Sequence, residues 1–424
     1  MVNFLGRRLG RWAAAAAAML VTGVASAQST AEITEDAVLA RWAARSEEVA
    51  SLRAQVRGAR FDVVTAALWP NPQVQLSFLG TPWGTPPDGE VNFGAQWTQP
   101  LPVFGQVPAR RASAVAALSV AEVNVGASLW SAASELQAGM VARAFADARV
   151  RLIERNLEEL GRVEEIIRRR VEAGANSPYD TLRAQATRST LRASLADATV
   201  ARERAEARLV AAIADDEVTE VPITRAGLAA FRGPESLPAL VELALRRRPD
   251  LELARRGERA SLAAAERWRA ETRWTPSVYV GAYATHAADS ASVTAGLSFP
   301  VPAFDRNQGL EGRARSDADG QRRLAHALEI RVAREVTGAW NAREHARAAL
   351  ARFREEGLVT GEALVRRAEV TYQTGSPGGA GFTVQDLFDA YRALWDARAQ
   401  ELDLMQTFAE AEADLERAAA LVVP

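Results

Sequence analysis

Four short segments alternate between apolar and polar residues, the pattern of β-strands that expose two unlike faces. In residues 73–79, Val74, Leu76 and Phe78 share one side, and glutamine and serine share the other. The same alternation recurs in 91–98, 278–285 and 292–299. The polar side of these segments is small and uncharged. The pattern fits a sheet with lipid outside and water inside, and equally a half-buried hairpin of a soluble domain.

Long runs without proline surround these strand pairs and predict helices. Residues 108–173 and 308–374 are each free of internal proline, and a helix of that length would span about 100 Å at about 1.5 Å per residue. A third helix is expected over 35–68, stopped by Pro70 and Pro72. Apolar residues follow coiled-coil spacing near the end of the first long run, at Ile153, Leu157, Leu160, Val163, Ile167 and Val171. Helices of this length predict a rod.

The chain repeats itself with a period of about 200 residues. The Pro-x-Pro-x-Phe motif of 100–104 returns at 300–304, and further landmarks recur in the same order. This period is longer than that of solenoid repeats, so we interpret it as a duplicated half-protein. Each half is expected to run helix, strand, strand, very long helix, helix. The expected division is repeat one over 35–214, a connecting equatorial segment over 215–235 and repeat two over 236–418.

The N-terminus has the pattern of an export signal. Arg7, Arg8 and Arg11 precede an apolar run of about 13 residues, shorter than the roughly 20 that a spanning helix needs. Residues 25–27, Ala-Ser-Ala, fit a cleavage site, so we predict a signal peptide over 1–27 and a mature chain over 28–424. No later stretch is expected to be long and apolar enough to span a membrane as a helix.

Composition narrows the chemistry. The 424 residues carry a net charge of −2, which does not suit a nucleic-acid-binding protein. There is no cysteine for disulfides, thiol chemistry or lipid attachment. The three histidines, His286, His326 and His345, are too few for a multi-histidine metal site. No nucleophile elbow or phosphate loop is present. We therefore expect no enzyme activity, no cofactor and no metal site.

The first hairpin tip combines a helix stop with a helix start. Gly174 suits the position after a helix end. Ser177 can cap the following helix, with Pro178 at its first position and Asp180 at its third. We therefore expect a tight turn between two antiparallel helices.

The second hairpin tip is longer and richer in glycine. Its first helix is expected to end at Gly375, and the next to start at Thr383 with Asp386 three residues later. Pro377 lies in the insertion between them.

Two further motifs lead to a family resemblance. Residues 68–72, Leu-Trp-Pro-Asn-Pro, and 299–309, Phe-Pro-Val-Pro-Ala-Phe-Asp-Arg-Asn-Gln-Gly, are similar to segments of the CzcC-like heavy-metal cation-efflux branch of the TolC-type outer-membrane efflux proteins. The resemblance covers the whole mature chain. It implies a mostly helical homotrimer with a small β part, in which twelve strands form one shared transmembrane β-barrel and twelve helices form a periplasmic tunnel.

The resemblance also implies a function. The chain would be a passive outer-membrane channel of a tripartite efflux system, in contact with outer-membrane lipid, a periplasmic adaptor protein and an inner-membrane pump of the resistance-nodulation-division type. Its cargo would be heavy-metal cations. An outer-membrane channel for drugs or other small molecules stays open as an alternative. A periplasmic coiled-coil scaffold or adaptor also stays open, and partition into the outer membrane would separate it from a channel.

Several site residues follow from the same resemblance. Residues 385–390 match the stretch whose acidic residues ring the closed aperture, which makes Asp386 and Asp389 the candidate ring. Asp386 could instead act only as a helix cap. Tyr372 matches a tyrosine that helps to hold the helices closed, although a packed aromatic on a helix seam fits as well. The tip arginine of better-known relatives is absent, and an Asp389–Arg183 pair between neighbouring hairpins is a hypothetical substitute.

Two further contacts are expected. The hairpin tips, including Gly174, Ser177, Pro178, Gly375 and Pro377, would meet the adaptor. Trp97 and Phe299 end their strands just before the long helices and would lie at the periplasmic side of the membrane, as aromatic girdle residues do.

Overall fold

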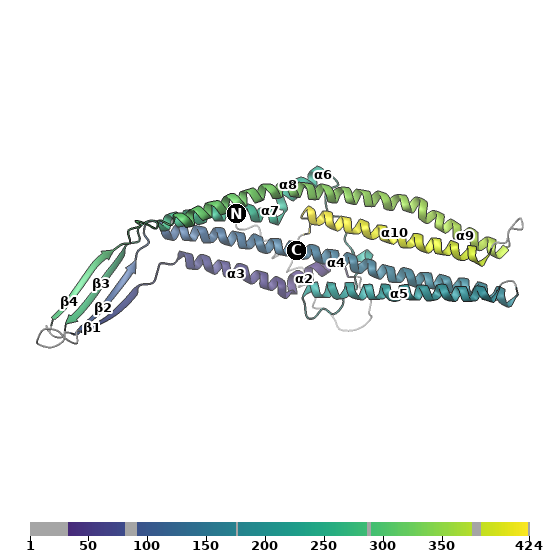
Figure 1. The fold of residues 1–424 in the computed structure, drawn as a ribbon, viewed down its shortest axis with the longest axis horizontal. Helices are drawn as coiled ribbons and strands as arrows, with labels where there is room; N and C mark the ends of the chain where they lie inside the picture. The colour runs from purple at the N-terminus through teal and green to yellow at the C-terminus, as the bar shows by residue number, and fades with distance from the viewer. Residues whose placement is uncertain (1–32, 81–90, 175–176, 286–289, 375–382, 423–424) are drawn as a thin grey trace, which may run out of the picture.

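The protein is a long helical rod with a four-stranded sheet at one end and two helical hairpins at the other (Figure 1). The computed structural model describes residues 33–80, 91–174, 177–285, 290–374 and 383–422. The predicted signal peptide, Gly375 and Pro377 lie outside the described residues. The predominance of helix and the small antiparallel sheet are confirmed.

The order of elements is the same in both halves of the chain. The first half contains α2 (Glu35–Arg45), α3 (Glu47–Ala67), β1 (Gln73–Gly80), β2 (Val91–Pro100), α4 (Gln106–Glu172) and α5 (Pro178–Ile213). A connection with one short 3₁₀ turn, η1 (Arg225–Gly227), follows. The second half contains α6 (Leu237–Arg247), α7 (Pro249–Glu271), β3 (Ser277–Thr285), β4 (Ser290–Ser298), α8 (Gln308–Phe353), the π-helical turn η2 (Arg354–Leu358), α9 (Val359–Thr374) and α10 (Val384–Ala418).

The helices pack side by side along the rod. On the sheet side of the midpoint, α4 contacts α3 and α7, and α7 in turn contacts α8. Towards the hairpin tips, α4 packs against both α5 and α10, and α9 packs against α10 (Figure 1). Each long helix therefore buries only a narrow stripe within the chain, and much of the rod surface remains exposed.

The helix expected over 35–68 is broken into α2 and α3 at Ser46. Ser46 is buried and has an extended ψ of 128°. The break frees the backbone amide of Glu47, which donates to the carbonyl oxygen of Ala214 at the end of α5 over 3.2 Å. Ala214 itself adopts a left-handed conformation, with φ of 49°. A contact with a distant segment therefore ends this helix, with no proline or glycine at the break.

The second long helix is also interrupted, whereas the sequence predicted one continuous run. Residues 354–358 form a π-helical turn, η2, between α8 and α9. The Phe353 ring packs directly against Gly357, where a side chain would not fit: a Cβ at Gly357 would lie 2.8 Å from Cε2 of Phe353. Arg354 donates from Nε to Oε1 of Glu401 on α10 over 2.7 Å. The contact with Glu401 holds the π-helical turn η2 against α10.

The expectation that no stretch after the signal peptide is long and apolar enough to span a membrane as a helix is wrong. An 18-residue stretch within α4 is long and apolar enough to cross a membrane by length and composition alone. Its hydropathy comes mainly from alanine and valine in residues 112–129, where Glu122 is the one charged residue. Only Ser113 and Val125 of this stretch are buried. The stretch is part of a 67-residue helix that packs on α3 and α7.

A buried polar network ties the two ends of the chain together near the middle of the rod. Nε2 of Gln137 on α4 donates to Glu35 on α2 over 3.1 Å and to Glu416 on α10 over 2.6 Å. The amide of Ala229 donates to Glu35, and that of Arg232 donates to Glu416, each over 3.0 Å. The two carboxylates are 3% and 4% exposed, so unpaired charge there would be costly.

This network makes stability depend on pH. Burial raises the pKa of the Glu35 carboxyl, against the opposing effect of the Ala229 amide. The folded chain therefore holds this proton more tightly than the unfolded chain. The stabilisation is fully present below the ordinary value of 4.5 and is lost as pH rises through the raised pKa. We expect Glu35→Gln to remove this part of the pH dependence of the thermal midpoint.

Asp36→Asn is the matched control for that measurement. Asp36 is the neighbouring acid on α2, and its exposed side chain pairs with Arg232 over 2.7 Å. Its removal should leave the pH slope in place. Equal slopes in Glu35→Gln and the unaltered protein would contradict the assignment to Glu35.

Candidate channel wall and periplasmic aperture

The sheet has one apolar face and one polar face, and the apolar face is bare. The strands follow the order β1-β2-β3-β4, all antiparallel. Leu76 is 78% exposed and Val293 is 79% exposed. Gln96 and Thr294, on the opposite face, are half-buried. This is the reverse of a soluble sheet, which covers its apolar face.

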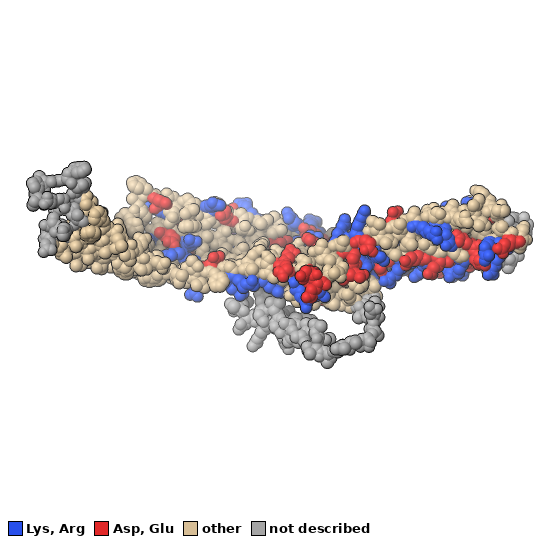
Figure 2. Space-filling view, turned by 90° about the horizontal axis from the view of Figure 1, so that it is seen from below, with Lys and Arg blue, Asp and Glu red and all other residues tan. Residues whose placement is uncertain are grey.

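No charged residue lies in the described strands. Residues 73–80, 91–100, 277–285 and 290–298 contain no Asp, Glu, Lys or Arg. Figure 2 shows the contrast: acidic and basic side chains crowd the helical rod and are missing from the visible surface of the sheet. The absence of charge suits a sheet that has one face exposed to hydrocarbon.

The two predicted interface aromatics lie at the helix-proximal end of the sheet. Trp97 is 41% exposed on the apolar face of β2, and Phe299 directly follows β4 and is 48% exposed. The Phe299 ring stacks on Trp274, with centroids 5.2 Å apart and planes inclined by 3°. Trp274 precedes β3, so the stack joins the two chain segments that enter and leave the second strand pair. Their position relative to a membrane stays a prediction.

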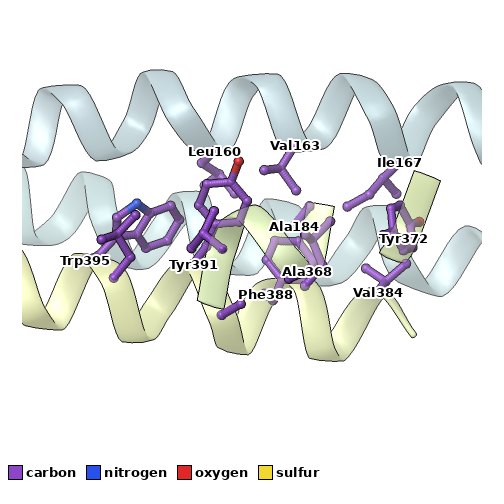
Figure 3. Packing of buried hydrophobic residues seen from close by; sticks show 14 residues of the cluster. Leu160, Val163, Ile167, Ala184, Ala368, Tyr372, Val384, Phe388, Tyr391 and Trp395 are labelled. Atoms are coloured by element: carbon purple, nitrogen blue, oxygen red, sulfur yellow. The ribbon is translucent and has the colours of Figure 1, made fainter. Parts of the chain in front are cut away.

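At the far end of the rod, four helices converge on one apolar core (Figure 3). Leu160, Val163 and Ile167 extend from α4, confirming part of the predicted seam as core. Ala184 comes from α5, and Tyr372 comes from α9. From α10 come Val384, Leu387, Phe388, Ala390, Tyr391, Leu394 and Trp395. The two hairpins are thereby packed together within one chain.

Tyr372 is a packed aromatic and also makes a specific contact between the hairpins. It is 4% exposed. The guanidinium carbon of Arg170, on α4, lies 4.3 Å from the centre of the Tyr372 ring. Nη1 of Arg170 also donates to the backbone carbonyl of Tyr372. Sequence reasoning missed Arg170, because it is one of three consecutive arginines and only the packing distinguishes it.

A second polar contact joins α4 to α10 and was also missed. Glu159 is 8% exposed and accepts from Trp395 Nε1 over 2.9 Å. Nη1 of Arg398 donates to both of its carboxylate oxygens, over 2.8 Å and 2.9 Å. The buried carboxylate is thus satisfied from one neighbouring helix. No sequence motif marks this group, because Glu159 lies more than 230 positions before Trp395 and Arg398.

The two candidate aperture acids differ in their partners. Asp386 accepts from the amide and the hydroxyl of Thr383, each over 2.7 Å, and completes a capping box. The Thr383 amide holds the pKa of the Asp386 carboxyl below its usual range. Asp389 is exposed on the same helix, and among the described residues it has one weak contact, from Gln385 over 3.5 Å. The Asp386 carboxylate therefore caps the start of α10, whereas the Asp389 carboxylate is exposed to solvent.

Arg183 does not pair with Asp389 inside the chain. Arg183 lies on α5 and is half-buried, and Asp389 lies on α10. Among the described residues no ion pair joins them. A pair between neighbouring chains of an assembly stays a hypothesis.

The first hairpin tip has the geometry that the sequence predicted. Gly174 has φ of +72°, and Ser177 caps α5 in a capping box with Asp180. Pro178 is the first residue of α5. Tyr179 and Leu182, on the first turns of α5, are 66% and 63% exposed. This exposed apolar pair was not predicted, and its spacing of three residues puts both on one face of the helix.

Comparison with known proteins gives a consistent result. Residues 38–215 match the family model for outer membrane efflux proteins. The cobalt-zinc-cadmium resistance protein CzcC of Cupriavidus metallidurans is 24% identical over 395 residues, which cover 92% of this chain and 90% of CzcC. Crystal structures of CusC match with a TM-score of 0.75 and 17% identity, over 94% of this chain and 95% of that one. VceC of Vibrio cholerae, an outer membrane protein, matches with a TM-score of 0.71 and 15% identity, over 91% and 95%.

Proposed function

We propose that this chain, which is similar to outer membrane efflux proteins over residues 38–215 and has the fold of outer-membrane channels, is the outer-membrane component of a tripartite efflux system that exports heavy-metal cations. The family and the fold are those of channel proteins. In this proposal the chain carries out no reaction and binds no cofactor. It provides a passive path, and an inner-membrane pump and a periplasmic adaptor deliver the cargo to its periplasmic end.

The bare apolar face of the sheet is the observation that carries this proposal. Four strands have two open edges, and open edges are not tolerated in lipid. Three chains would contribute twelve strands, enough to close a water-filled barrel. The exposed residues Leu76, Val293 and Leu297 would then face lipid, and the polar side would line the lumen.

The cargo is proposed from the relative and from charge. CzcC is named as a cobalt-zinc-cadmium resistance protein. In a trimer, three exposed copies of Asp389 at the hairpin end would favour cations over anions. Among the described residues no group of His, Cys, Asp or Glu could hold a metal ion. A conduit needs no such site, because it must release what it carries.

The closed state is proposed to depend on the contact between Arg170 and Tyr372. This contact joins α4 to α9 beside the second tip. An inter-chain Asp389–Arg183 pair would add to it. Together they would take the place of the absent tip arginine. The apolar pair Tyr179 and Leu182, beside Gly174, Ser177 and Pro178, is proposed as part of the surface that meets the adaptor.

The assembly can be tested directly. We expect the mature protein, extracted from outer membranes in mild detergent, to have the mass of a trimer by multi-angle light scattering. The physical reason is that a single sheet would expose unpaired backbone groups to the detergent interior. A monomer that retains its strand content by circular dichroism would contradict the shared barrel. Recovery in the soluble periplasmic fraction would favour the scaffold alternative.

A further inference from the structure

Two tyrosines on the polar face of the sheet lie directly opposite glycines. Tyr283 of β3 is the register partner of Gly94 in β2. Tyr279 of β3 is the register partner of Gly296 in β4. The two tyrosines are four residues apart on β3 and therefore share one face of the sheet. The Tyr283 ring lies over β2, and the Tyr279 ring lies over β4.

The rings occupy the space that a side chain would need. A Cβ at Gly296 would lie 2.5 Å from Oη and 2.6 Å from Cζ of Tyr279. A Cβ at Gly94 would lie 2.6 Å from both Cδ1 and Cε1 of Tyr283. The Tyr283 hydroxyl donates to Oε1 of Gln96 over 3.1 Å. Both rings therefore lie along the wall and do not stand away from it, and the glycines make this possible.

A shallow cleft of about 460 Å³ lies over this surface. Its lining includes Gln96, Thr98, Tyr279, Tyr283, Thr294 and Ser298. All of these groups are neutral hydrogen-bonding side chains. Such a wall can hydrogen-bond to the water around an ion without a fixed charge that would hold the ion in place.

We propose that the pairs Tyr279–Gly296 and Tyr283–Gly94 set the free width of the barrel lumen, and that the barrel passes hydrated ions by size, without selecting their charge. This inference rests on the proposed barrel with its polar face inside. In a trimer the pairs would form a belt of six rings held flat against the wall. Selection by charge would then be left to Asp389 at the other end of the rod.

The belt makes a specific prediction for Gly296→Ala. The added methyl would clash with the Tyr279 ring and turn it towards the lumen in every chain. The chain has no cysteine, so Ser298→Cys can serve as a single reporter. Ser298 lies on the polar face at the end of β4 nearest the helices. A reagent that enters from the opposite end of the strands therefore meets the Tyr279–Gly296 row before it reaches Ser298. In intact cells, maleimide–polyethylene glycol reagents of increasing size would have to pass the belt to label it.

We expect Gly296→Ala to lower the largest reagent size that labels the reporter, and Gly296→Ala/Tyr279→Ala to restore it. The double variant separates ring displacement from general damage. Tyr279→Ala alone should raise the size limit, and this arm holds even if Gly296→Ala fails to assemble. An unchanged size limit in Tyr279→Ala, or a limit that the double variant does not restore, would overturn the inference. No labelling of the reporter by the smallest reagent in the otherwise unaltered protein would overturn the water-filled barrel itself.

Discussion

Leu76→Arg is expected to abolish most of the assembled protein in the outer membrane. Leu76 lies in the middle of β1, and its side chain is 78% exposed on the apolar face. An arginine near the middle of a bilayer on the lipid face of a barrel costs about 2–4 kcal/mol. In a trimer this cost is incurred three times. Leu297→Arg, on β4, should act in the same direction. The amount of trimer in outer-membrane extracts, measured by immunoblot, checks both.

Gln75→Arg is the matched control for Leu76→Arg. Gln75 is the adjacent residue of the same strand and points to the polar face, opposite Gln96. A charge there would be solvated by lumenal water, so trimer yield should stay near that of the unaltered protein. Equal loss in Gln75→Arg and Leu76→Arg, or normal yield for both lipid-face variants, would mean that the apolar face does not meet lipid.

Asp389→Asn is expected to lower the cation selectivity of the channel in planar bilayers. Each trimer would lose three carboxylates whose described contacts include no salt bridge, which weakens attraction of cations at the aperture. Block by multivalent cations added on the periplasmic side should weaken as well. Exposed charges act over about 10 Å at 0.1 M salt, so the difference from the unaltered protein should shrink at 1 M salt.

Two capping residues serve as controls for this aperture prediction. Asp386→Asn removes the carboxylate that accepts from Thr383, and Asp180→Asn changes the equivalent cap on α5. Each should cost about 1 kcal/mol of stability. Asp180→Asn should leave selectivity intact, and Asp386→Asn should change it less than Asp389→Asn. If Asp386→Asn/Asp389→Asn conducts and selects like the unaltered protein, the aperture lies elsewhere.

The strands and the long helices were predictable because each rests on a local pattern. Alternation placed all four strands within two residues of their observed ends. The absence of proline placed both long helices, and the serine and threonine caps placed the starts of α5 and α10. The partition of polar and apolar residues between the two faces of the sheet was also visible in the sequence.

Interruptions caused by distant contacts were not predictable. Ser46 breaks a helix whose freed amide, at Glu47, donates to Ala214, 167 residues later. The π turn at Arg354–Leu358 is held by Glu401 on another helix, and Gly357 was its one local sign. Such partners are set by packing, so no window of sequence contains both members.

The candidate aperture site was predictable only in part, for the same reason. Asp386 and Tyr372 were identified by position in a family motif, and packing then assigned their partners. Thr383 binds the Asp386 carboxylate, and Arg170 stacks on Tyr372. The sequence offered no reason to choose Arg170 over Arg168 or Arg169, since only the α4–α9 contact distinguishes the three.

Cysteine accessibility along β2 tests the central claim most directly. The chain has no cysteine, so single cysteines can be placed one at a time at six positions of β2 in the proposed trimer in outer membranes: Asn92, Phe93, Ala95, Gln96, Trp97 and Thr98. A membrane-impermeant maleimide should label positions 92, 96 and 98, whose side chains would face the water-filled lumen, and should leave 93, 95 and 97 unlabelled in lipid. Labelling of all six positions, or labelling with the opposite alternation, would contradict a barrel with its polar face inside.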